Sequence, residues 1–374
     1  MVAACAAVTN CNETKILNSA PERARVMRVA KGNGIRPVTA RIARWAGKLV
    51  LISCFVPGCA AIREYQAAQE VRRGELLLAS DDLEAALSAF QEAARLDPQL
   101  AVAHSRMGRI YRRIGEYEEA IDSFIAAVRR DPFSFADTFN LAQLYHFTHR
   151  LKEAIQAYLH AVELRPHDAD VQLNLGVCYQ QSGDFEQAVD RFQRAIAIDG
   201  TQGHGFVNLG VALDAQGKYY EAISAYKAAL ERDSRQPLVL VNLANTYINL
   251  ERYKMAKQAL TEATSMDLKL AAAHEALGYC LFRMRDFPNA ELAYQQALTC
   301  DLRLPRAHAG LGSILMIAYV EDHTRADRRS LALEHWHRSL ELDPNQPRIR
   351  NLISQYAPRS KDPEQALLGS RHSP

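Results

Sequence analysis

The chain has 374 residues, of which 48% are hydrophobic and 24% are charged, a composition typical of a soluble folded protein. The formal net charge of +2 hides an asymmetry, because residues 1–59 carry a net charge of +7 and residues 60–374 therefore carry −5. A mildly acidic main part argues against nucleic acid as a partner.

The first 58 residues have the pattern of a signal peptide. No acidic residue occurs between Glu22 and Glu64, and this basic stretch contains the eight-residue apolar run 49–56. Such a run is too short to span a bilayer, which needs about 20 residues in a helix, but it fits the apolar part of a secretory signal. We therefore predict a leader over residues 1–58. Residues 1–26 would be a mis-called extension if translation starts at Met27.

The sequence VPGC that ends at Cys59 resembles the lipobox of bacterial lipoproteins. The resemblance implies that Cys59 is acylated, with palmitate as one such acyl group, and that it becomes the first residue of the mature chain. Residues 59–66 would then be a short tether. Ala60, where inner-membrane retention signals have Asp, implies the periplasmic face of the outer membrane. The alternatives are a plain signal peptide, a short anchor or an organellar transit peptide.

Residues 67–346 repeat with a period of 34 residues. In each unit the eighth residue is Gly or Ala, the twentieth is Ala, and a large side chain recurs in the second half. The units begin at Ala67, Ala101, Phe135, Ala169, Gly203, Pro237, Ala271 and Pro305. A strict period of this length predicts a solenoid, in which each repeat buries its apolar face against its neighbours.

The small and large positions resemble those of the tetratricopeptide repeat (TPR) family. The resemblance implies an all-α fold, a right-handed TPR superhelix of about eight helix-turn-helix repeats. Eight extra residues near 321–329 lengthen the first helix, the turn or both in the eighth repeat. We expect residues 347–357 to form a capping helix with a polar outer face, and residues 358–374 to be a flexible tail.

The sixth residue is asparagine in four consecutive repeats, which are those of Asn140, Asn174, Asn208 and Asn242. In the TPR architecture the first helix of each pair lines the concave face, so these side chains are expected to form a ladder there. An asparagine offers both a donor and an acceptor and can bind one peptide unit. A similar ladder in the nucleocytoplasmic glycosyltransferase that modifies Ser and Thr binds peptide backbone. The alternative is that these asparagines are only solvated.

Other side chains of the first helices complete the predicted peptide site. The apolar ones are Phe139, Val177, Val211 and Tyr279. The N-terminal end of this predicted site is rich in arginine, with Arg106, Arg109 and Arg113. These basic side chains suit an acidic peptide segment. Alternatively, these arginines belong to a solvated face with Glu116, Glu118 and Glu119 as partners.

The sequence contains no nucleophile elbow, phosphate loop or zinc motif, so we expect no catalytic residue, cofactor, metal or small-molecule substrate. Three histidines share the fourth position of their repeats and are predicted to be core or boundary residues: His104, His274 and His308. His335 and His337, two apart on a helix, cannot bind one metal together. Three cysteines are predicted to be buried small hydrophobes: Cys178, Cys280 and Cys300.

These patterns predict a non-enzymatic scaffold lipoprotein that binds extended segments of partner proteins in a bacterial envelope assembly. The resemblance suggests a pilus, secretin or polysaccharide-export type of assembly. One alternative is a recognition subunit related to the TPR region of protein O-GlcNAc transferase. Another is a cytosolic or organellar chaperone adaptor.

Overall fold

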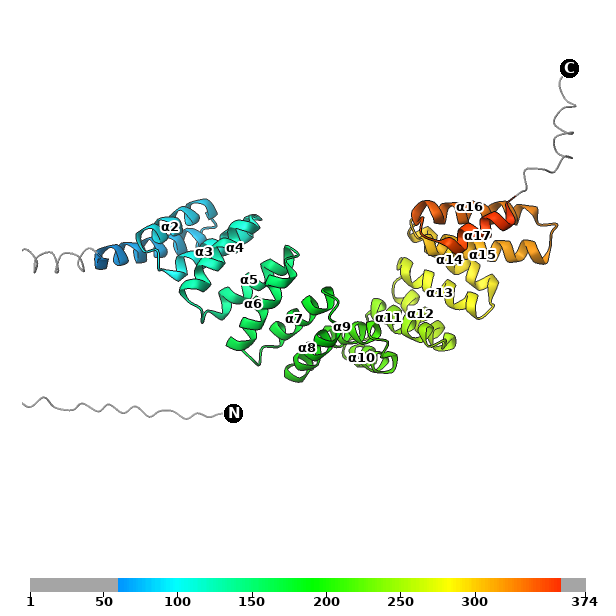
Figure 1. Cartoon of the computed structure of the whole chain (residues 1–374), viewed down its shortest axis with the longest axis horizontal. Helices are drawn as coiled ribbons and strands as arrows, with labels where there is room; N and C mark the ends of the chain where they lie inside the picture. The colour runs from blue at the N-terminus through cyan, green and yellow to red at the C-terminus, as the bar shows by residue number, and fades with distance from the viewer. Residues whose placement is uncertain (1–59, 358–374) are drawn as a thin grey trace, which may run out of the picture. The chain divides into compact units, whose positions relative to one another are not determined.

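The computed structural model describes residues 60–357 (Figure 1). The chain divides into two units, Met1–Ile62 and Arg63–Pro374, and every helix named below belongs to the second. The predicted leader, Cys59 and the predicted tail lie outside the described residues. Residues 60–79 are helical, so the segment expected to be a tether is helical from residue 60 on.

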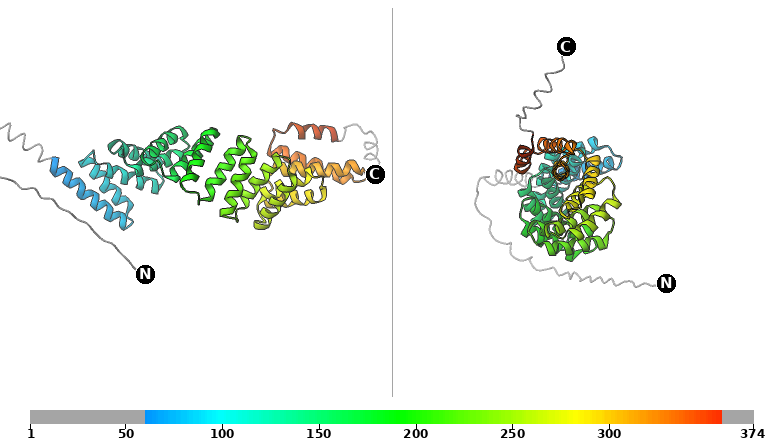
Figure 2. Two further views of the ribbon diagram at one scale, coloured as in Figure 1. Left: turned by 90° about the horizontal axis from the view of Figure 1, so that it is seen from below. Right: turned by 90° about the vertical axis from the view of Figure 1, so that its right-hand side faces the viewer.

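From residue 83 on, the described residues form helices arranged in consecutive pairs (Figures 1 and 2). The first helices of the pairs are α3 (Ala101–Ile114), α5 (Phe135–Phe147), α7 (Ala169–Gln181), α9 (Gly203–Ala215), α11 (Pro237–Asn249), α13 (Ala271–Arg283) and α15 (Pro305–Glu321). The second helices are α2 (Leu83–Leu96), α4 (Tyr117–Arg130), α6 (Leu151–Leu164), α8 (Phe185–Ile198), α10 (Tyr219–Arg232), α12 (Tyr253–Met266), α14 (Phe287–Cys300) and α16 (Ala326–Leu342), and α17 (Pro347–Tyr356) follows them. No strand occurs within residues 60–357. The predicted all-α solenoid is confirmed.

Short turns join the two helices of each pair. In seven turns one residue has the left-handed backbone conformation that ends a helix. Three of these are the glycines Gly115, Gly183 and Gly217, and the other four are Asp81, His149, Glu251 and Arg285. A left-handed residue reverses the chain within about three residues, and this holds each pair of helices close together.

The helices of a pair meet where a glycine faces an aromatic ring. A Cβ atom added at Gly176 would lie 2.6 Å from Cε1 of Phe192, which is fully buried. Gly210 meets the ring of Tyr226 in the same way. A small residue at this position lets the large side chain pack close against the opposite helix, and the third and sixth repeats have Ala142 and Ala244 there.

The first helices form the inner layer of the solenoid. They contact each other across repeats, α7 with α9, α9 with α11, α11 with α13, and α13 with α15, as well as contacting their own partners. Among the described residues, no two second helices contact each other as extensively as these first helices do. Side chains of the first helices that are not needed for packing are therefore available along one common surface.

The extra residues of the eighth repeat are distributed over both helices. Helices α15 and α16 have 17 residues each, whereas α13 and α14 of the preceding repeat have 13 and 14. The turn Asp322–Arg325 takes one residue more than the preceding turn, which runs from Met284 to Asp286. Both helices of this repeat thus extend about one turn beyond those of their neighbours.

Candidate functional site

The four asparagines of the predicted ladder lie on consecutive first helices, α5, α7, α9 and α11. All four are half-buried. Their shared position in the repeat gives them the same register on each helix. The ladder is therefore built by the stacking of identical units.

The hydrogen bonds of these asparagines differ along the row. The Nδ2 group of Asn140 donates to the carbonyl of Ala136 at 2.7 Å, and its Oδ1 accepts from Arg112 at 2.7 Å. Nδ2 of Asn174 donates to the carbonyl of Asp170 at 2.8 Å, and no donor within residues 60–357 reaches its Oδ1.

The side chains of Asn208 and Asn242 make no hydrogen bond within the described part of the chain, although the carbonyl of Asn242 accepts one from the Thr246 hydroxyl. A peptide would compete with internal partners at Asn140. At the other three asparagines it meets open acceptors or donors.

The predicted apolar residues lie beside the ladder but differ in exposure. Phe139 stacks on Phe135 with ring centroids 5.7 Å apart and meets the edge of Tyr158 at 6.0 Å. It is therefore engaged in packing between helices. Val177 and Val211 are half-buried against the core. Tyr279 is 39% exposed, and it is the most accessible of the four.

The predicted arginine-rich end is largely paired within the chain. Arg106 donates to Glu75, and Arg113 lies 2.6 Å from Asp81. Arg109 is exposed and has no carboxylate within 4.0 Å among residues 60–357. The partners come from the first repeat and not from the glutamates at 116, 118 and 119. An acidic segment would have to displace Glu75 or Asp81 to bind at two of the three arginines.

A pocket of about 850 Å³ opens between α11, α13, α15 and α17. Tyr279 lines it, and the asparagines of the ladder do not. Sequence reasoning predicted apolar side chains along this stretch of the inner surface but did not predict a pocket. The only signal for one was the change from asparagine at the sixth position to Ala276 and then Gly310.

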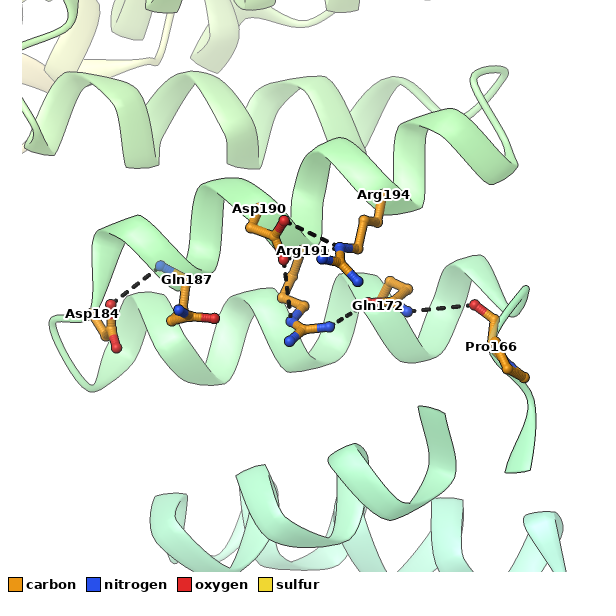
Figure 3. A network of polar contacts seen from close by, with 7 residues as sticks. All are labelled: Pro166, Gln172, Asp184, Gln187, Asp190, Arg191 and Arg194. Carbon is orange, nitrogen blue, oxygen red and sulfur yellow. Dashed lines mark hydrogen bonds and ion pairs between the residues drawn. The ribbon is translucent and has the colours of Figure 1, made fainter. Parts of the chain in front are cut away.

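Two of the three histidines at the fourth position, His274 and His308, hydrogen-bond the turns between repeats. Nε2 of His274 bonds the carbonyl of Leu268 at 3.1 Å, and Nε2 of His308 bonds that of Leu302 at 3.2 Å. Both histidines are buried, as predicted. In the fourth repeat Gln172 takes this role, with its Nε2 donating to the carbonyl of Pro166 and its Oε1 accepting from Arg191 (Figure 3).

One contact was not predicted from the sequence. Nδ1 of His308 lies 2.9 Å from Nδ1 of His335, so one of these two nitrogens must be unprotonated. Burial lowers the pKa of both imidazoles. Nearby charges are Arg338, which also lowers the pKa of His308, and Glu334, which raises that of His335. No group of three or more metal-ligating side chains occurs within residues 60–357.

This pair predicts loss of stability in acid. Between pH 7.5 and 5.5 the unfolded histidines, with pKa values near 6.5, bind protons that folded His308 and His335 bind less readily. The unfolded state is then favoured, and the free energy of unfolding falls with pH. The variant His308→Gln, which copies Gln172, should lose less stability over this range. Urea unfolding at both pH values measures the difference.

The control is His337→Gln, a substitution of an exposed histidine, and it should behave as wild type. An equal pH dependence of His308→Gln and wild type would contradict the expectation.

The described cysteines are free thiols. Cys178 and Cys280 are buried, as predicted, and burial raises the pKa of the Cys178 thiol to about 12. Cys300 is exposed, so its predicted burial is wrong. It is the last residue of α14, and its Sγ lies 3.7 Å from the carbonyl oxygen of Leu268.

Tetratricopeptide repeat models match residues 71–135, 134–200, 173–237 and 215–278, together more than half of the chain. These models describe repeats and not a catalytic domain. No curated protein matches the chain. No helix within residues 60–357 has the length and apolar character needed to cross a membrane.

Several solved structures share the fold. The C-terminal part of a TPR repeat-containing protein from Cytophaga hutchinsonii is 20% identical, with a TM-score of 0.55 over 64% of this chain and 99% of that one. The Cut9–Hcn1 hetero-tetramer of APC/C is 17% identical, with a TM-score of 0.50 over 76% of this chain and 55% of that one. YrrB, described as a TPR protein with an unusual peptide-binding site, is 21% identical, with a TM-score of 0.46 over 50% of this chain and 97% of that one. At these sequence identities, the similarity is evidence for a shared fold and for nothing more specific.

Proposed function

Because this chain belongs to the tetratricopeptide repeat family, we propose that it is a non-enzymatic scaffold that holds extended segments of partner proteins along its inner helices. One observation carries the proposal. Asn174, Asn208 and Asn242 lie in the same register on three consecutive inner helices and keep hydrogen-bonding groups open.

The spacing of these asparagines suits an extended chain. Neighbouring helices pack about 8–10 Å apart, and a strand advances about 3.3 Å per residue. One asparagine therefore meets roughly every third residue of the segment. Such contacts read the peptide backbone, which every sequence shares, so the ladder supports binding without selecting side chains.

The test is the triple variant Asn174→Ala, Asn208→Ala, Asn242→Ala. At about 0.5–1.5 kcal/mol per hydrogen bond, the loss of three weakens binding by about 1.5–4.5 kcal/mol, or roughly 10- to 1000-fold. The probe is an array of 15-residue peptides, incubated with the fluorescently labelled full chain. The readout is the titrated Kd of the peptides that wild type binds.

The control variant is Asn289→Ala with Asn345→Ala, two exposed asparagines away from the inner helices. It should bind like wild type. If the triple variant also keeps wild-type affinity, or if wild type binds no peptide, the ladder does not bind extended segments.

We further propose that the scaffold works in a bacterial envelope assembly, anchored at the periplasmic face of the outer membrane through acylated Cys59. The support is the lipobox-like VPGC sequence at the end of a basic and apolar leader. Anchoring at residue 59 would bring the repeats close to the bilayer surface, because the first repeat begins at Ala67. A pilus, secretin or polysaccharide exporter is the kind of assembly that such a lipoprotein would serve.

A further inference from the structure

The pocket between α11, α13, α15 and α17 has apolar walls. Ile248 of α11, Phe282 of α13, and Ile349 and Leu352 of α17 all line it. Its volume of about 850 Å³ is ample for a large side chain together with the adjoining backbone. Together with α14, which contributes Tyr294, five helices line it, so it depends on the stacking of neighbouring units.

At the pocket the sixth repeat position changes from asparagine to smaller residues. After Asn242 this position is Ala276 and then Gly310. A Cβ atom added at Gly310 would overlap the ring of Tyr294, which reaches the pocket from α14. The ring of Tyr294 thus occupies the space that a side chain at position 310 would need.

The Tyr294 hydroxyl has no hydrogen-bond partner within residues 60–357, although the residue is only 3% exposed. The corresponding Tyr226 of the fifth repeat donates to Oδ2 of Asp214 at 3.1 Å. The residue that corresponds to Asp214 in the seventh repeat is Phe282, which offers no acceptor. Tyr294 lines the pocket, so its free hydroxyl offers a hydrogen-bonding group to a ligand.

The charged side chains around the pocket are mainly positive. Arg306 of α15 and Arg348 of α17 are exposed at its edge, and neither has a carboxylate within 4.0 Å in the described part of the chain. The single acidic lining residue is Glu275, which is half-buried; burial raises the pKa of its carboxyl group, and the charge of Arg306 lowers it in part. Two unpaired guanidinium groups beside an apolar wall favour a ligand that bears a carboxylate.

We propose that this pocket binds an apolar–acidic segment of a partner protein. A large apolar side chain enters between Ile248, Phe282 and Leu352. The peptide backbone bonds the Tyr294 hydroxyl, and a neighbouring Asp or Glu side chain meets Arg306 and Arg348. The inference rests on the proposed function. The asparagine ladder would contact only the peptide backbone, and the pocket adds a preference for particular side chains.

The test reverses the charge at the edge of the pocket. In the peptide array, each 15-residue peptide carries one Phe or Leu followed by Asp, Glu, Ser or Lys. Wild type should bind the acidic peptides about fivefold more tightly than the Ser peptides, the size expected of exposed ion pairs. In Arg306→Glu with Arg348→Glu the preference should move to the Lys peptides. A matched charge change on outer helices, Arg129→Glu with Lys227→Glu, should leave it unchanged.

Two further variants test the interior of the pocket. Tyr294→Phe keeps the ring, and it should weaken binding of all apolar peptides severalfold at unchanged stability. The corresponding Tyr226→Phe should leave binding unchanged, because that hydroxyl is satisfied internally. Gly310→Asn places a Cβ atom in overlap with Cζ of Tyr294, so the ring must move, and the preference for an apolar residue should be lost.

The outcomes separate this inference from the ladder. If the asparagine triple variant weakens all peptides equally but keeps the apolar–acidic preference, the pocket acts independently of the ladder and the inference stands. If wild type binds peptides without that preference, or if the charge reversal leaves it in place, the pocket inference is overturned while the ladder remains.

Two other occupants would also overturn it. Peptide binding that appears only after removal of residues 358–374 would assign the pocket to the chain's own C-terminal segment. Dimerisation that Gly310→Asn abolishes, measured by analytical ultracentrifugation, would assign it to a second copy.

Discussion

Replacing Trp336 by Ala is expected to destabilise the eighth repeat by about 3–5 kcal/mol, the usual cost of removing a large aromatic side chain from a core. The indole is 1% exposed, and its Nε1 donates to the carbonyl of Ala309 at 3.2 Å. A Cβ atom added at Gly312 would lie 2.6 Å from Cδ1 of Trp336, so the indole packs directly against this glycine. The ring centroids of Trp336 and Tyr356 are 6.3 Å apart, and Tyr356 belongs to α17. One side chain thus joins α15, α16 and α17.

The loss should be local, because the stability of a solenoid is approximately a sum over repeats and their nearest-neighbour interfaces. Hydrogen exchange measured by mass spectrometry should quicken in residues 305–356 and stay unchanged in residues 101–215. The control Trp336→Phe recreates the pairing of Gly176 with Phe192 and loses chiefly the indole hydrogen bond, at about 1 kcal/mol. Faster exchange in every repeat would show that the array unfolds as one unit, contrary to this expectation.

Replacing Cys59 by Ser is expected to abolish fatty-acid labelling of the chain and to release it from membranes. Several acyl chains, at about 0.8 kcal/mol per buried CH₂, hold a protein on a bilayer far more firmly than a single one. A serine hydroxyl cannot replace the thiol that would be acylated. The measurement is incorporation of radiolabelled palmitate in a bacterial host, followed by separation of membrane and soluble fractions.

The matched control is Cys54→Ser, in the apolar run of the same leader. It should keep both the label and the membrane association. Equal labelling of the Cys59→Ser variant and wild type would contradict acylation at this residue. The peptide-binding proposal would be unaffected, because it depends only on the inner helices.

The packing of each helix pair could be predicted from the sequence because its causes are local. Gly176 and Phe192 recur with the period of the repeat, and each repeat touches only its neighbours, so one unit determines the next. The same argument placed the asparagines on the inner helices. It did not show that Arg112 already occupies Oδ1 of Asn140, because a hydrogen bond between different repeats depends on side-chain conformation.

Where the repeats depart from their common pattern, only the tertiary structure decided the outcome. The pairing of Arg106 with Glu75, and of His308 with His335, depends on how close two helices bring long side chains. The pocket depends on the reach of Tyr294 from α14 over Gly310 and on the position of α17. The sequence by itself determined the solenoid, because a strict period repeats the same short-range contacts. The tertiary structure alone decided which inner groups stay free for a partner, because that depends on contacts between units that are not identical.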